Sequence, residues 1–262
     1  PVMRALADVK PVQQAMPGSS VVFSIYSDLA QATSTLTEAS DVSSIALGNP
    51  TQVAVTLQEY GSAVTTTKKL NLTSFNDVDS ALADIIAYNA ADSIDSVVAA
   101  VLTAGSNAIY AGTATNTAGI TATQLMTVSD IRQAVTELRT NKALPRIGEL
   151  YAAYLHPRQT ADLRAETGTG GFQELSKYVD RTPFVAGAVG VIEGAFVVET
   201  PRVPYATNGT TNVYKAVVAG REALAEAMGQ DISTVIGPQI DALRRFHTIG
   251  WYYFGGWSLL RQ

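Results

Sequence analysis

Two glutamates, Glu193 and Glu199, form the pattern that most resembles a catalytic pair. They lie six residues apart in the Val-rich segment VIEGAFVVETP. If this segment is one strand, both side chains share a face, and paired carboxylates can act as general acid and general base. The segment contains no companion cation and no second acidic motif. We therefore expect solvated positions or ion pairs with a neighbouring chain, and keep a hydrolase using these residues as a remaining alternative.

The two histidines and one glycine-rich run offer little chemistry. His156 and His247 are 91 residues apart and lie in no metal-binding spacing, so we expect structural roles for both. The run GTGG at residues 168–171 lacks the Lys-Ser/Thr ending of a phosphate-binding loop. The chain has no cysteine, which excludes disulfides, zinc–thiolate sites and thiol catalysis.

Threonines and lysines stand at nucleophile–base spacing in the run TTTKK. The pairs are Thr65 with Lys68 and Thr66 with Lys69. Such a pair needs a pocket, which an exposed strand end does not provide. We predict no catalytic residue, no cofactor and no metal ligand, and we expect that the chain is not an enzyme.

The composition indicates a folded chain with uneven charge. Of 262 residues, 47% are hydrophobic and 16% are charged, which is enough apolar material for a core. The net charge of −5 provides no basic field to attract nucleic acid. Residues 1–110 hold 4 Lys/Arg and 10 Asp/Glu, and no cation lies between Lys10 and Lys68. This asymmetry suits self-association between different surfaces. No apolar run approaches the roughly 18 residues of a membrane span, so no membrane contact is expected.

The first third of the chain combines two long, simple elements. Residues 20–27 favour a strand, and residues 51–67 alternate as a return strand. Between them, residues 28–50 are mostly Ala, Ser, Thr and small acids, so residues 21–67 predict one long hairpin with a loose tip. An amphipathic pattern then predicts a helix over residues 79–104, about 39 Å long at 1.5 Å per residue.

The rest of the chain is expected to contain shorter helices and strands. Residues 1–19 predict an irregular arm, and Thr127 with Asp130 resembles a capping box that starts a helix. The expected elements are a helix at residues 128–141, a buried strand at 149–156, a helix at 157–167, strands at 189–199, 213–219 and 231–236, a short helix at 220–228, and an aromatic extended run at 244–260.

The hairpin has no core near it in the sequence. An isolated two-stranded hairpin is marginal in water, so we expect it to pack on other copies of the chain. The residues expected to make assembly contacts are Phe23, Tyr26, Val53, Val55, Leu57, Tyr60, Lys68 and Lys69.

An ordered set of segments resembles one family of proteins. The segments are TLQEYGSAVTTT at residues 56–67, LTSF at 72–75, LTAGSNAIYAG at 102–112, YLHPRQTADLRAETG at 154–168, VIEGAFVVETPR at 191–202 and TIGWYYFGG at 248–256. With the order of hairpin, long helix and final strand, they resemble the major capsid proteins of tailed phages with the Hong Kong 97-type fold. Within these, the group typified by the shell protein of coliphage N-four is the most similar.

The resemblance implies an α+β fold and a division of the chain. Residues 1–20 would be an N-terminal arm and 21–67 the extended loop. Residues 68–119 would belong to the peripheral domain, with the spine helix at 79–104. Residues 120–235 would be mainly the axial domain, and residues 236–262 a strand that returns to the peripheral domain.

The resemblance also implies partners. Copies of the chain would form the hexamers and pentamers of an icosahedral virion shell, assembled in the host cytoplasm. Expected partners are a scaffolding protein or maturation protease, a portal, a decoration protein and packaged double-stranded DNA, contacted without specificity. A bacterial nanocompartment shell of encapsulin type is the alternative. Only about 20 residues precede the hairpin, which leaves open a cleaved leader, and we predict no lysine cross-link.

Overall fold

The structure is a computed structural model of the whole chain. It describes residues 1–11, 19–36, 38, 41–42, 44–74, 78–167, 171, 190–209, 211–238, 241–243 and 245–261, with the backbone alone at 78 and 79. The elements, in chain order, are η1 (Met3–Leu6), β1 (Ala7–Pro11), β2 (Ser20–Ile25), β3 (Thr51–Thr56), β4 (Gln58–Thr67), α1 (Lys68–Thr73), α2 (Val78–Leu102), η2 (Thr117–Gly119), α3 (Val128–Thr140), β5 (Tyr151–Leu155), α4 (Pro157–Ala165), β6 (Val191–Ile192), β7 (Ala195–Glu199), β8 (Tyr205–Asn208), β9 (Thr211–Tyr214), β10 (Val217–Ala219), β11 (Leu224–Ile236) and β12 (Phe246–Leu259).

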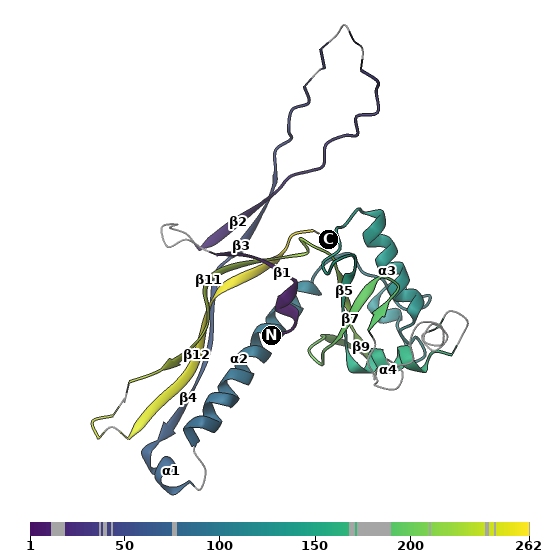
Figure 1. Cartoon of the computed structure of the whole chain (residues 1–262). Coiled ribbons are helices and arrows are strands. Elements are labelled where there is room, and N and C mark those ends of the chain that lie inside the picture. The colour runs from purple at the N-terminus through teal and green to yellow at the C-terminus, as the bar shows by residue number, and fades with distance from the viewer. Residues whose placement is uncertain are drawn as a thin grey trace.

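A long sheet with one long helix along it forms the centre of the molecule. The strand order is β1-β11-β12-β4, with β1 parallel to β11 and the other neighbours antiparallel. Figure 1 shows α2 running beside this sheet. Trp251, Tyr253 and Trp257 alternate along β12 and pack with Ile94 and Val98 of α2 in one core. The aromatic run predicted as extended is therefore strand β12, on which α2 packs.

The long helix matches its prediction within two residues at either end. By length and hydropathy Ser80–Leu102 also meets the criterion for a membrane span, so the expectation that no segment does was wrong. In the structure, Ile94 and Val98 are fully buried against the sheet. The buried Asp95 carboxylate accepts hydrogen bonds from the backbone N–H groups of Val2 and Met3 at 2.6 and 2.9 Å. These are the contacts of a core helix.

A second, smaller unit lies beside the C-terminal end of α2 (Figure 1). Its sheet has the order β10-β5-β7-β6, and every residue of β5 is buried. The predicted capping box of Thr127 and Asp130 is present at the start of α3, and Pro157 begins α4. An ion pair of 2.7 Å between Arg146 and Asp8 ties this unit to the N-terminal segment.

Two expectations near the ends of the chain were wrong. In place of the helix predicted at residues 220–228, a turn at residues 221–222 leads into strand β11, which begins at Leu224. Ala, Glu and Met favour helices locally, but hydrogen bonding to β1 on one side and β12 on the other outweighs that propensity. The irregular arm predicted at residues 1–19 contains η1 and β1, which cover the core with Met3 and Leu6. Residues 12–18 lie outside the described part.

The predicted hairpin over residues 21–67 is divided in the structure. Strands β2 and β3 pair with each other from Ser20↔Thr56 to Ile25↔Thr51. After Leu57, whose backbone N–H donates to the Ser19 carbonyl at 2.8 Å, the chain enters β4 and pairs with β12 instead. The predicted strand at residues 213–219 is likewise divided into β9 and β10. The return strand therefore joins the hairpin directly to the long sheet.

Candidate assembly surface

The arm is defined here as β2, β3 and residues 26–50 between them. Its root, β2 and β3, rests on the long sheet through a small core. Val21, Val55 and Leu57 are buried together with Ala225 and Ala227 of β11. Two of the predicted assembly residues, Val55 and Leu57, thus contact the chain's own core. They hold the arm to the body.

The next predicted residues lie further out on the root. Phe23 pairs with Val53 across the ladder, and both are half-buried. The Lys10 ammonium lies 5.4 Å from the centre of the Phe23 ring. Tyr26 follows the last strand pair and is 53% exposed, and its carbonyl accepts a long hydrogen bond of 3.5 Å from Arg261. Exposure therefore increases from the root toward the tip.

Tyr60 lies at the junction of β4 with the body. Its ring centre is 5.8 Å from that of Trp257 and 6.3 Å from that of Tyr253. Its hydroxyl donates to Gln58 Oε1 at 2.8 Å, and burial raises the pKa of this hydroxyl. The residue is one of nine that line a small hollow between the arm root, α2 and β12.

The two predicted lysines are not near the arm. Lys68 and Lys69 begin α1, at the opposite end of β4, and both are exposed. The Lys68 N–H donates to the Arg245 carbonyl at 2.7 Å, which joins α1 to the turn between β11 and β12. The structure thus separates the lysines by the length of β4 from Phe23, Tyr26, Val53, Val55 and Leu57, whereas Tyr60 lies within β4 itself.

The arm tip, residues 26–50, carries apolar side chains that sequence reasoning overlooked. Figure 1 shows this segment extending beyond the β2–β3 ladder, away from the rest of the chain. Its described large apolar residues are all strongly exposed: Tyr26 53%, Leu29 59%, Leu36 78%, Val42 61%, Ile45 65% and Leu47 61%. Bulky aliphatic residues within a Ser/Thr/Ala-rich stretch were the signal available in the sequence. So many exposed large apolar residues along one segment suit contact with another chain.

Comparison with known proteins agrees with this geometry. Residues 3–261 match the model of one family, described as phage capsid protein. The chain belongs to the phage capsid protein family. No curated protein sequence matches it.

Solved phage capsids share the fold of this capsid protein. It is similar to a capsid chain of cyanophage P-SCSP1u at 18% identity and a TM-score of 0.71, over 98% of this chain and 84% of that one. For the capsid of Ralstonia phage GP4 the identity is 15% and the TM-score 0.73, over 98% and 83%. For the acidic stable capsid of Helicobacter pylori bacteriophage KHP30 they are 17% and 0.68, over 97% and 81%. The expected α+β, Hong Kong 97-type capsid fold is confirmed.

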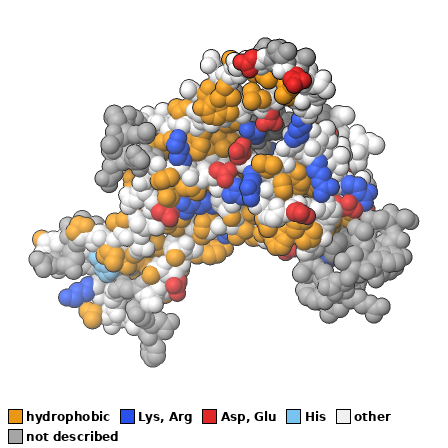
Figure 2. Space-filling view, turned by 45° about the horizontal axis from the view of Figure 1, so that its top comes forward, with side chains coloured by type: hydrophobic (Ala, Val, Ile, Leu, Met, Phe, Trp, Pro, Cys, Tyr) orange, Lys and Arg blue, Asp and Glu red, His pale blue; other side chains and the backbone are white. Residues whose placement is uncertain are grey.

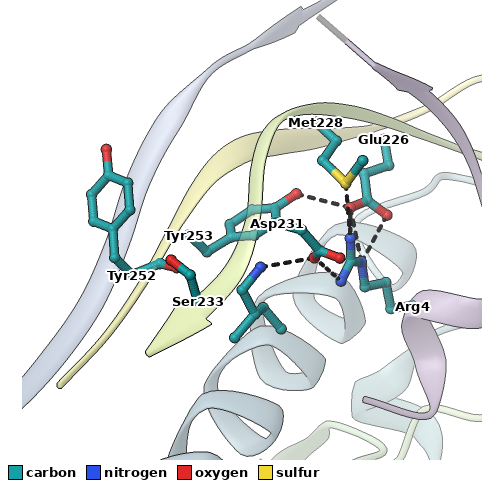
Figure 3. A network of polar contacts seen from close by, with 8 residues as sticks. Arg4, Glu226, Met228, Asp231, Ser233, Tyr252 and Tyr253 are labelled. Atoms are coloured by element: carbon teal, nitrogen blue, oxygen red, sulfur yellow. Dashed lines mark hydrogen bonds and ion pairs between the residues drawn. The ribbon is translucent and has the colours of Figure 1, made fainter. Parts of the chain in front are cut away.

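A partly buried ionic network anchors the N-terminal segment of the capsid protein to the long sheet. Figure 3 shows Arg4 between Glu226 and Asp231. Arg4 Nη2 lies 2.7 Å from Glu226 Oε1, and Nη1 lies 2.8 Å from Asp231 Oδ1. The fully buried Tyr253 hydroxyl donates to Glu226 at 2.9 Å. The network joins η1, β11 and β12 in the body from which the arm extends.

The charges of this network perturb one another. Burial lowers the pKa of the Arg4 guanidinium, but hydrogen bonds to Glu226 and Asp231 outweigh burial and hold that pKa above its usual value. Burial, together with the charge of Glu226, raises the pKa of the Tyr253 hydroxyl. The arrangement stabilises an ionised Arg4 and a neutral Tyr253, and leaves no free base or nucleophile.

The prediction that Glu193 and Glu199 share one face of a single strand was wrong. Glu193 and Gly194 form a tight turn with φ of 49° and 85°, so β6 and β7 are two strands and not one. Glu193 pairs with Arg132 at 2.9 Å. Glu199 accepts a hydrogen bond from the Thr160 hydroxyl at 2.6 Å. Positive φ at both turn residues is the mark of a type I′ hairpin, which an EG dipeptide between Val-rich runs could have signalled.

The other candidates for chemistry have local partners. His156 caps α4, its Nδ1 accepting from the Arg158 N–H at 3.1 Å, and its ring stacks on Tyr214 at 4.1 Å. A ring nitrogen of His247 lies 2.8 Å from the Thr66 hydroxyl. Of the GTGG run, residues 168–170 lie outside the described residues. Within the described residues, no three His, Asp or Glu side chains gather as a metal site.

Proposed function

We propose that this chain is the major capsid protein of a tailed phage, of the group typified by the coliphage N-four shell protein. Copies of it assemble into an icosahedral shell around double-stranded DNA. The observation that carries the proposal is the arm: its root is built into the chain's own core, while its tip offers apolar side chains to another copy. The match to the phage capsid family over residues 3–261 supports the same conclusion.

The two units of the fold take the roles of peripheral and axial domain in this proposal. The peripheral domain comprises the long sheet, with β4, β11 and β12, and the spine helix α2. The axial domain comprises β5–β7 with α3 and α4, and surrounds the centre of each hexamer or pentamer. Strand β11 begins at Leu224, so we move the end of the axial domain from residue 235 to about residue 223.

The proposed partners follow from a shell of this kind. They are other copies of the chain, a scaffolding protein or maturation protease, a portal and a decoration protein. Figure 2 shows Lys/Arg and Asp/Glu side chains interspersed on the face it presents, so this face has no basic patch and the proposed contact with packaged DNA is weak and non-specific. In this role the chain has no catalytic activity and no membrane contact, and it assembles in the host cytoplasm.

Electron microscopy of the purified chain, with its mass measured by light scattering, tests the proposal. Closed icosahedral particles tens of nanometres across are expected. Nuclease-protected DNA in particles from infected cells separates a phage shell from a nanocompartment, which would hold a cargo enzyme. A chain that stays a monomer or small ring under all assembly conditions contradicts the proposal.

A further inference from the structure

The two edge strands of the long sheet differ in how they are protected. At one edge, β1 is five residues long, contains Asp8 and Lys10, and ends at Pro11. Shortness, charged side chains and proline are the features that keep an edge strand from pairing with another chain. At the other edge, β4 is ten residues long, contains no proline and has one charged residue, Glu59. Only the β1 edge is therefore protected against pairing.

The outer side of β4 is regular and uncovered. β4 pairs with β12 over ten residues without a register shift, whereas the ladder between β11 and β12 contains two shifts. On its outer side, the backbone of residues 58–66 makes no hydrogen bond to any other described part of the backbone. Residues 61–65 are all exposed, so neither face of this stretch is covered. An edge of this form presents N–H and C=O groups with which an incoming strand can pair.

The charges at the two ends of β4 indicate which strand fits it. Glu59 lies near its start, and Lys68 and Lys69 follow its end. Within the part of the chain that the structure describes, none of the three belongs to an ion pair, although Glu59 accepts a hydrogen bond from the Tyr252 hydroxyl. When two identical strands pair antiparallel, the acidic end of each lies beside the basic end of the other. A second β4 therefore complements the first.

We propose that β4 of one copy pairs antiparallel with β4 of a second copy, across a two-fold axis perpendicular to the sheet. Val64 of each copy lies opposite Val64 of the other, and Ala63 lies opposite Thr65. Glu59 then comes beside Lys69. Opposed side chains lie on the same face in this register, because their residue numbers are both odd or both even. The two sheets join as one, with both α2 helices on the same face.

The contact needs no second kind of surface. A two-fold contact is isologous, so each copy contributes the same strand and one open edge per chain is enough. The central pair of valines adds a β-branched cross-strand contact, a type that stabilises antiparallel ladders. The pairing goes beyond the proposed shell function, because it depends neither on the arm nor on closure of a shell.

A single cysteine tests the register, since the chain has no cysteine of its own. Val64→Cys puts two thiols directly opposite each other, and the Cα–Cα distance in an antiparallel pair, about 4.5–5.5 Å, suits a disulfide. Oxidation should give a dimer of twice 27.6 kDa, both in particles and in the concentrated unassembled chain. Val9→Cys is the matched control on the β1 edge, where Val9 is 49% exposed and Val64 on the β4 edge is 40% exposed. It should give at least tenfold less dimer.

The outcomes separate the pairing from the shell. Particles of Val64→Cys without the dimer, or with no more dimer than Val9→Cys gives, overturn the pairing and leave the shell function intact. If the unmodified chain forms no particles, the shell function is overturned, and the concentrated unassembled chain then decides the pairing. A dimer specific to Val64→Cys supports the pairing there, and its absence overturns it.

A second pair of variants tests the pairing without oxidation. Val64→Lys puts two like charges opposite each other, which destabilises a cross-strand pair. It should lower the dimer fraction of the concentrated chain, measured by sedimentation, at least tenfold. Val9→Lys should match the parent chain, and circular dichroism checks that both variants are folded. Equal dimer fractions for the two folded variants overturn the proposal.

Discussion

The arm tip and the sheet beneath the arm differ in how they use apolar side chains. In the sheet and its helix, Leu224, Tyr253 and Ile94 are fully buried by the chain itself. In the tip, each described large apolar residue is more than half exposed. Both regions have apolar residues, but only one has elements on which to pack them. The body therefore folds on internal contacts, whereas in the proposed shell the tip would pack on another copy.

Removal of the tip should have the largest effect on assembly and so tests the difference between tip and body most strongly. Because Ile25 pairs with Thr51, replacing residues 26–50 by Asn-Gly closes the root hairpin with a two-residue turn. Closed shells should be lost, and the free energy of unfolding of the unassembled chain should change by less than about 1 kcal/mol. Electron microscopy and urea denaturation measure the two effects. Normal shells from this variant would show that the tip is not an assembly element.

The next largest effect should come from the buried network of the body. Glu226→Ala leaves Arg4 without its fully buried partner, so the free energy of unfolding should fall by about 3–5 kcal/mol. Urea denaturation of the unassembled chain measures it. Glu38→Ala in the exposed tip is the control and should change the stability by less than about 0.5 kcal/mol. Similar values for both would show that the body does not depend on this network.

A matched pair of valines sharpens the comparison within the arm. Val55 in the root is fully buried, and Val42 in the tip is 61% exposed. Val55→Ala should cost the unassembled chain about 1.5–3 kcal/mol through lost burial, and Val42→Ala less than about 0.5 kcal/mol. Thermal unfolding followed by circular dichroism compares them. A larger loss of stability for Val42→Ala than for Val55→Ala would contradict the prediction, because it would mean that the tip packs on its own chain.

The sequence predicts most of the elements whose pattern is local. The helix around Ile94 and Val98, the capping box of Thr127 and Asp130, and the aromatic strand with Trp251 all follow from spacing and capping. Strand β11 does not, since its Ala, Glu and Met residues favour a helix and only pairing with β1 and β12 makes it a strand. Local propensity is a weak guide where a segment has partners on both sides.

The candidate surface was predictable only in part. The sequence predicts the hairpin, but the expectation that it has no core in its own chain was wrong, because Val55 and Leu57 of the root pack on β11. The burial of Val55 and the exposure of Ile45 could not be predicted from the sequence, because both depend on where the sheet ends beneath the arm. The partnership of Arg4 with Glu226 joins residues 222 positions apart, so nothing in the local sequence indicates it.

The smallest effect concerns the exposed end of the same network. Burial would raise the pKa of the Asp231 carboxyl, but the hydrogen bond from Arg4 outweighs it and holds that pKa below its usual 3.8. The resulting stabilisation is present above pH 3.8 and is lost as the pH falls through the lower pKa of the folded chain. Because the Asp231 side chain is 62% exposed, the effect is modest.

Asp231→Asn should therefore lower the urea midpoint slightly at pH 7 and not at pH 2, relative to the parent chain measured at the same pH. Asp28→Asn in the tip should leave the midpoint unchanged at both. An equal loss for Asp231→Asn at both pH values would mean that packing, and not charge, explains the contribution of Asp231. A pH-dependent loss confined to Asp231→Asn would show that an ionic contact of the body stabilises the unassembled chain. It would also show that Asp28 in the tip makes no such contact.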